Sequence, residues 1–134
     1  MRQLSVELRY LIYTAILLAI VWVPYILAHV QQVGAMKAFS YTDDDKMPDW
    51  AHRLKRAHYN LVENMPLFVI AVAAGEFANV HTATTAACAM IFFWARVAHP
   101  IVAVAQWWGT RTAVFTIGWV AVVVHLLAVL VAAR

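Results

Sequence analysis

The chain has few cysteines and few charged residues, the features of disulfide-bonded domains and of soluble domains, respectively. One cysteine in 134 residues excludes an internal disulfide and a thiolate metal site, so we expect Cys88 to be a small core residue. Only 13% of the residues are charged and 64% are hydrophobic, which lies outside the range of soluble domains. The few basic residues stand at segment ends, which excludes the patch of a nucleic-acid-binding protein. These shortages indicate a membrane protein with a single domain, residues 1–134.

Long apolar runs account for most of what is present. No charge occurs from Tyr10 to Met36, a run longer than the roughly 20 residues that cross a bilayer core of about 30 Å. Pro24 lies inside it and is expected to bend the helix, which membrane helices tolerate. No small-residue cleavage site follows a short apolar core, so we expect no removable signal peptide. The pattern predicts an all-α membrane protein, a bundle of four transmembrane helices over about residues 10–36, 49–78, 81–98 and 112–133.

The basic residues fall unevenly on the two sides of the predicted bundle. Seven Lys and Arg belong to the side of the first and third loops, whereas the opposite side has only Arg2, Arg9 and Arg134. By the positive-inside rule, both termini are predicted to lie on the non-cytoplasmic side. The first loop contains three consecutive aspartates, 43–45, which cannot all converge on one ion. We therefore expect a solvated linker there and no metal site.

Polar residues concentrate at the entrance of the second helix. Ionisable groups at such a place cost several kcal/mol unless they are paired or hydrated, so they are the first candidates for function. At about 100° per residue, four of them share an arc of roughly 80°: Arg53, Arg56, Asn60 and Glu63. His58 points elsewhere. Such a face suits a small zwitterionic ligand, because arginine binds carboxylates and glutamate accepts from an ammonium. Mutual pairing that holds the bundle together is an equal alternative.

The ends of the third and fourth helices carry a second basic cluster. Arg96 and His99 are three residues apart and so share a helix face, and Arg111 opens the fourth helix. These cations are predicted to lie at one membrane depth with the first cluster. For Arg96 and Arg111 taken singly, snorkelling to lipid phosphates is the alternative. Trp107 and Trp108 are expected to anchor the membrane interface.

Together these motifs resemble one known family. The run Arg53-x-x-Arg56-Ala57-His58-x-Asn60-x-x-Glu63-x-x-Pro66, with Arg96-Val97-Ala98-His99 and Arg111-Thr112, is similar to the MAPEG family of membrane-associated proteins in eicosanoid and glutathione metabolism. The resemblance covers nearly the whole chain. It implies a homotrimer of four-helix subunits that binds glutathione between neighbouring subunits near the cytoplasmic face. The short length is typical of bacterial members, so we expect an inner-membrane location.

The resemblance also implies roles for individual residues. Arg111 matches the arginine held to stabilise the glutathione thiolate, since a fixed cation lowers the pKa of a thiol. A lipophilic electrophile or hydroperoxide, arriving from the membrane lipids, is the implied second substrate, and the implied activity is that of a transferase or peroxidase. Matches to glutathione-binding positions are Arg53, Arg56, His58, Asn60, Glu63, Arg96 and His99.

Two departures from the family pattern bear on activity. Tyrosines usual in catalytic members are replaced by Ala103 and Phe115, which removes ligand hydrogen bonds of roughly 1 kcal/mol each. Tyr59 and Tyr41 are candidates to compensate. The family also includes a member that binds lipid without using glutathione. A non-catalytic lipid-binding or accessory subunit of a larger membrane complex is therefore the alternative function.

Other polar and small residues within the spans have their own interpretations. Intramembrane histidines can ligate haem, which makes an electron carrier using His29 and His125 a third possibility, although helix register places the two at different depths. A hydrogen-bonded core role is the more usual one for such histidines. Glu76 and His81 are expected to snorkel or to cap the turn near Asn79, with a contact between subunits as the alternative. Two glycines are expected to permit close helix packing, Gly75 and Gly118.

Overall fold

The computed structural model describes residues 3–40, 46–107 and 109–134, and within these ranges the chain is helical with no strand. The helices are α1 (Val6–Val21), α2 (Val23–Val33), α3 (Ala35–Ala38), α4 (Asp49–Ala78), α5 (Ala83–Ala105) and α6 (Thr110–Ala132). Four segments are long and apolar enough to cross a membrane: α1 with α2, α4, α5 and α6. The chain is thus an all-α integral membrane protein. The expectations for Arg2, Tyr41, residues 43–45 and Trp108 lie outside the described residues.

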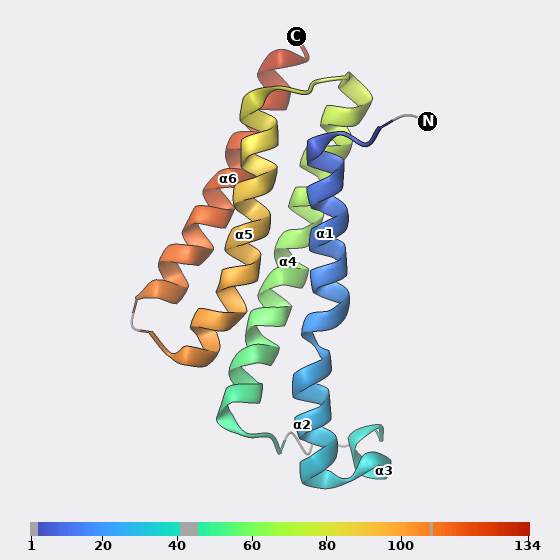
Figure 1. Ribbon diagram of the computed structural model, residues 1–134, viewed down its shortest axis with the longest axis vertical. Helices are drawn as coiled ribbons and strands as arrows, with labels where there is room; N and C mark the ends of the chain where they lie inside the picture. Colours follow the sequence, from blue (N-terminus) through green and yellow to red (C-terminus); the bar gives the residue numbers. More distant parts are fainter. Residues whose placement is uncertain (1–2, 41–45, 108) are drawn as a thin grey trace.

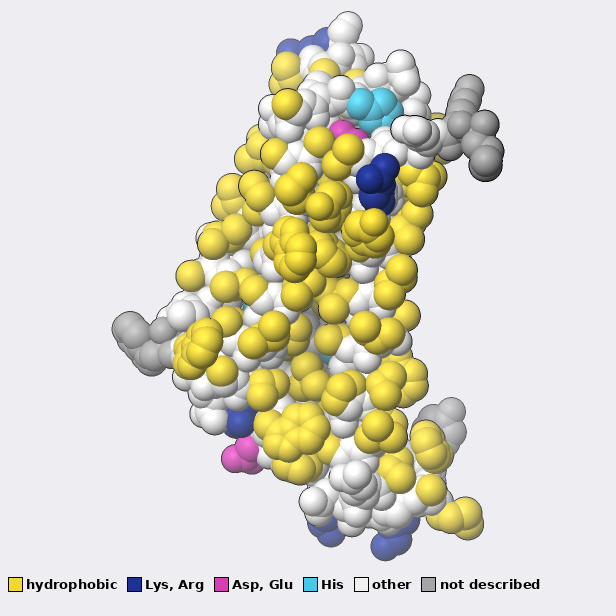
Figure 2. Space-filling model, viewed as in Figure 1, with side chains coloured by type: hydrophobic (Ala, Val, Ile, Leu, Met, Phe, Trp, Pro, Cys, Tyr) yellow, Lys and Arg dark blue, Asp and Glu magenta, His cyan; other side chains and the backbone are white. Residues whose placement is uncertain are grey.

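The four long segments run side by side along one axis (Figure 1). Both described chain ends and the α4–α5 turn lie at one end of the bundle, which we call the terminal end. The α5–α6 turn and the start of α4 lie toward the opposite end, which we call the loop end. Hydrophobic side chains cover the middle of the face seen in Figure 2, and most charged side chains on that face lie toward the two ends. This distribution is the one a bilayer requires.

The core is built where α4, α5 and α6 pack together. Phe68 of α4 and Phe92 of α5 are both fully buried, and their rings stack with centroids 4.2 Å apart. Small side chains surround the pair, including Ala71, Ala89 and Ala121, so the helices approach closely. Gly75 lies in the last turn of α4, where an added Cβ would lie 3.3 Å from the carbonyl oxygen of Val80 in the following turn and 3.5 Å from Cγ2 of Val129 on α6.

Helix limits differ from the sequence expectation except in α4. The first helix begins at Val6 and not near Tyr10, because the Ser5 side chain caps it by accepting from the Leu8 amide. It is interrupted at Trp22, two residues before Pro24, whose missing amide hydrogen weakens this turn.

The third span begins and ends later than expected. It starts at Ala83, after a capping box formed by Thr82 and Thr85. It continues through Pro100 to Ala105, well beyond Ala98. The last helix likewise starts at Thr110, before residue 112. These limits differ from the approximate ones expected, because caps and packing, which hydropathy does not report, fix helix ends.

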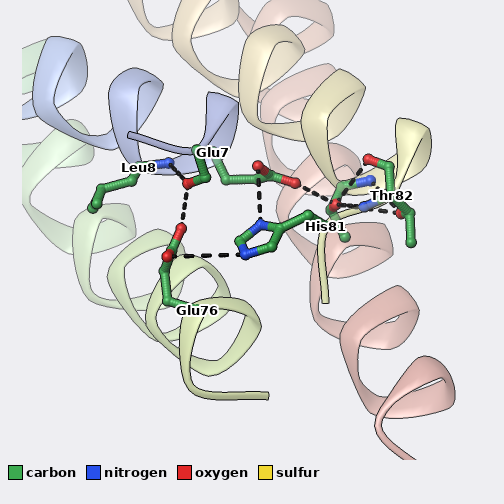
Figure 3. Close-up of polar contacts among 7 residues, drawn as sticks. Glu7, Leu8, Glu76, His81 and Thr82 are labelled. Carbon is green, nitrogen blue, oxygen red and sulfur yellow. Dashed lines mark hydrogen bonds and ion pairs between the residues drawn. The ribbon is translucent and has the colours of Figure 1, made fainter. Parts of the chain in front are cut away.

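A polar cluster ties three helices together at the terminal end (Figure 3). Glu7 of α1 is only 4% exposed, and it accepts a hydrogen bond from Thr85 of α5. His81 bridges two carboxylates, with Nδ1 3.5 Å from Glu7 and Nε2 4.0 Å from Glu76. Ser5 also donates to Glu76. This cluster holds α1 against the α4–α5 hairpin, and Glu7 is a member that the sequence analysis missed.

Candidate functional site

A cavity of about 240 Å³ lies between α4, α5 and α6 toward the loop end. Five residues singled out from the sequence line it: Arg53, Arg56, Asn60, His99 and Arg111. The other lining residues are Ala57, Ala103, Thr112 and Phe115. Side chains from three separate helices therefore meet in one cavity. The sequence analysis had predicted that these residues lie at the same depth in the membrane.

Local structure explains why these residues meet. Arg53, Arg56 and Asn60 are three and four residues apart, so one face of α4 presents all three. Gly109 precedes α6 with φ 73°, a left-handed conformation that glycine adopts without strain. This turn folds α6 back along α5 and brings Arg111, in the first turn of α6, to the same cavity as His99.

Arg53 has a polar partner in Gln106, which follows the last residue of α5. When the side-chain amide of Gln106 is oriented with its oxygen toward the guanidinium, that oxygen accepts from Nη1 and Nη2, both at 3.1 Å. The opposite amide orientation would set donors against donors. The Nε atom of Arg53 is buried and has no hydrogen-bond partner among the described residues.

Arg96 lies behind the cavity and is not part of its lining. Its side chain is 2% exposed, and Nη1 donates to Oδ1 of Asn60 at 3.0 Å. The guanidinium carbon lies 4.8 Å from the Phe92 ring centroid and 5.5 Å from that of Phe115. Within the described part of the chain, Nε and Nη2 are buried without partners. The guanidinium is thus held mainly by aromatic faces and a single amide.

Besides Arg96, two residues assigned by the resemblance do not line the cavity within one chain, His58 and Glu63. The His58 ring faces α2, where its Nδ1 lies 2.9 Å from the hydroxyl of Tyr25. This agrees with the helix geometry, which directs His58 away from the arginine face. Glu63 is exposed on α4. A contribution from His58 or Glu63 to a site between subunits stays a prediction.

The two replaced tyrosine positions belong to the same cavity. Ala103 and Phe115 both line it, so the absence of two hydroxyls is a property of the site itself. Tyr59 is exposed and is not a lining residue. Thr112 supplies a hydroxyl group to the lining.

The two histidines considered for haem lie toward different ends of the bundle. His29 stands near the end of α2, where its Nδ1 is 3.1 Å from the Lys46 carbonyl oxygen. His125 is 1% exposed beside Phe68, near the C-terminal end of α6. One subunit therefore does not pair them as axial ligands. Among the described residues, no group of three or more His, Cys, Asp or Glu is arranged to hold a metal.

The electrostatics of the cavity favour an anion. Three guanidinium groups line it, and the described lining includes no carboxylate. Arginine offers forked donors that match carboxylates, and its charge persists at any physiological pH. A thiol bound near such cations would ionise more readily than in water.

Fold and site together define a class, the four-span helical membrane proteins with a basic cavity toward one end of the bundle. The chain matches the MAPEG family over residues 10–131, and it belongs to that family. Membership fits membrane-bound, glutathione-related transferase, isomerase or peroxidase activity in general. No curated protein and no solved structure matches the chain.

Proposed function

We propose that this protein is a glutathione-dependent transferase or peroxidase that acts on a lipophilic electrophile or hydroperoxide within the membrane. The observation that carries the proposal is the cavity in which Arg53, Arg56, Asn60, His99 and Arg111 meet, in a chain of the MAPEG family. Glutathione carries two carboxylates and a thiol, and this set of donors suits those groups.

The roles of the arginines follow from their chemistry. Arg53 and Arg56 bind glutathione carboxylates through forked hydrogen bonds. Arg111 stabilises the thiolate, whose sulfur then attacks. In transfer, the sulfur bonds to an electrophilic carbon as a leaving group departs or a strained ring opens. In peroxide reduction, it takes the outer oxygen, the O–O bond breaks, and the alkoxide gains a proton. A second glutathione then yields glutathione disulfide and water.

A neighbouring subunit completes the proposed site. About 240 Å³ is below the roughly 300 Å³ at the lower limit of usual small-molecule sites. The described lining also offers no carboxylate to the glutathione ammonium, whereas Glu63 is exposed. We therefore propose the homotrimer that the family resemblance implies, with an acceptor for the ammonium supplied by a second copy.

An apolar groove is available for the second substrate. It occupies about 800 Å³ between α5 and α6 and is lined by Ile91, Ala113, Ile117 and other mainly apolar residues. Thr112 lines both this groove and the arginine cavity. A lipophilic molecule in the groove would thus lie next to a bound thiolate.

The groove and the missing hydroxyls also favour a second candidate function. Ala103 and Phe115 make part of the cavity wall apolar, which suits a lipid chain better than a peptide. A lipid-binding or accessory subunit of a larger membrane complex is therefore the competing proposal.

Turnover separates the two candidates. Purified protein in detergent is supplied with glutathione and either an aryl halide or a lipid hydroperoxide, and thiolate absorbance is recorded in the ultraviolet. The transferase or peroxidase proposal predicts turnover and a thiolate signal that Arg111→Ala abolishes and Arg111→Lys partly restores. Arg134→Ala, at the terminal end, serves as the matched control. Turnover and thiolate signal unaffected by Arg111→Ala would contradict the role of Arg111, and absence of both would favour the lipid-binding function.

A further inference from the structure

The hydrogen bond between Arg96 and Asn60 fixes the orientation of an amide in the cavity wall. A guanidinium group has donors and no acceptor, so the Asn60 atom that faces Nη1 at 3.0 Å is the oxygen. Arg96 itself is not a lining residue, whereas Asn60 is. The group that Asn60 can present to the cavity is therefore its amide N–H.

The surroundings of Arg96 hold it in this position. Phe92 and Phe115 lie 4.8 Å and 5.5 Å from its guanidinium carbon. Gly118 of α6 provides the remaining space, because a Cβ there would lie 3.2 Å from Nη2 and 3.4 Å from the guanidinium carbon. It would also lie 3.2 Å from the Cβ of Ala95. Even an alanine at residue 118 would need the guanidinium and Ala95 to shift by a few tenths of an ångström, and a larger side chain would need more.

Fixing Asn60 as a donor leaves the cavity with few acceptors. The three lining arginines only donate, and among the described lining residues the side-chain acceptors left are on His99 and Thr112. Without Arg96, the Asn60 amide could rotate and offer its oxygen to an ammonium. With Arg96 present, the α4 wall recognises a carboxylate or a similar acceptor.

We propose that Arg96 is a positioning residue, which orients Asn60 to donate to an anionic group of the ligand, and that Gly118 is required because it makes room for the guanidinium. That this ligand is glutathione rests on the proposed function. The orientation of Asn60 and the requirement for Gly118 do not depend on the identity of the ligand. This assignment differs from direct ligand binding by Arg96, which the family resemblance implies.

The first test compares glutathione with its diethyl ester, in which both carboxylates are uncharged. Calorimetry on the full-length protein should show that Arg96→Met weakens glutathione binding about tenfold, within the range of lost charged hydrogen bonds, and leaves ester binding unchanged. Arg96→Lys should restore part of the preference, since lysine also donates, and Gly118→Ala should reduce it. An equal loss for both ligands would overturn the proposal, because it would indicate a general structural role.

A double-mutant comparison separates positioning from direct contact. If Arg96 acts through Asn60, Arg96→Met should have no further effect on glutathione binding in an Asn60→Ala background. If the two losses add, Arg96 contacts the ligand itself and the proposal fails. Val97→Ala, the neighbouring position on α5, is the matched control and should leave the preference for glutathione over the ester unchanged.

A ligand-free measurement keeps this proposal separate from the proposed function. Should wild-type protein not bind glutathione, the proposed function fails, and the positioning role is then read from the side-chain amide signals of Asn60 in nitrogen-15 NMR spectra. These signals, identified by their loss in Asn60→Asp, should shift in Arg96→Met and Gly118→Ala but not in Val97→Ala. Unchanged Asn60 signals in Arg96→Met would overturn the positioning role.

Discussion

Replacing Phe115 with tyrosine returns a hydroxyl group to the candidate site. The Phe115 ring lines the cavity, lies 5.5 Å from the Arg96 guanidinium carbon and has its centroid 6.5 Å from that of His99. The added oxygen would therefore enter a basic environment in which a ligand carboxylate or thiolate can accept from it. One new hydrogen bond contributes about 1 kcal/mol, or roughly fivefold in affinity. We expect Phe115→Tyr to tighten glutathione binding by that factor.

Calorimetry on detergent-purified protein measures this change directly. Phe93→Tyr is the matched control, because it adds the same hydroxyl on α5 beside Tyr10 and outside the cavity lining. The control should leave the glutathione dissociation constant unchanged. Equal gains in both variants, or weaker binding in Phe115→Tyr alone, would refute the placement of Phe115 against the ligand.

Three further predictions concern stability, measured by thermal unfolding in detergent. Glu7→Gln should lower the free energy of unfolding by about 1 to 3 kcal/mol, because Glu7 is buried and hydrogen-bonded to Thr85 of α5. Glu63→Gln, at an exposed position, is the control and should change this free energy by less than about 0.5 kcal/mol. Equal effects of the two substitutions would count against the polar cluster. Thr82→Ala should cost about 1 kcal/mol by removing the capping box of α5, and no loss would argue against that cap. Phe68→Ala should cost about 3 kcal/mol or more, since its fully buried ring stacks on Phe92, and a loss below about 1 kcal/mol would place the core elsewhere.

Hydropathy predicted the four spans because a bilayer imposes a minimum length of apolar sequence. Local side-chain contacts decided the helix ends, and these are less visible in the sequence. The charge-free run begins at Tyr10, which suggested a helix start there, yet α1 begins before it. Glu7 lies in the first turn of α1, where it is buried and partnered by Thr85 and His81. A buried carboxylate at a membrane helix end becomes predictable only when its partners on other helices are known.

Helical periodicity predicted part of the candidate site. The spacing of Arg53, Arg56 and Asn60 places them on one face of α4, and the structure brings them to one cavity. Periodicity could not show that Arg96 binds Asn60 from behind the cavity, since that contact depends on how α4 and α5 pack. The motif resemblance also assigns His58 to the site; within one chain its ring forms a hydrogen bond with Tyr25, and a contribution to a site between subunits stays a prediction.

Glutathione binding tests the central claim most directly. Calorimetry compares wild-type protein with Arg56→Ala, which changes a cavity residue, and with Arg134→Ala at the terminal end as the control. The account predicts saturable binding that Arg56→Ala weakens by about 1 to 3 kcal/mol and that Arg134→Ala leaves unchanged. Absence of binding at millimolar glutathione, or equal affinity in all three proteins, would contradict it.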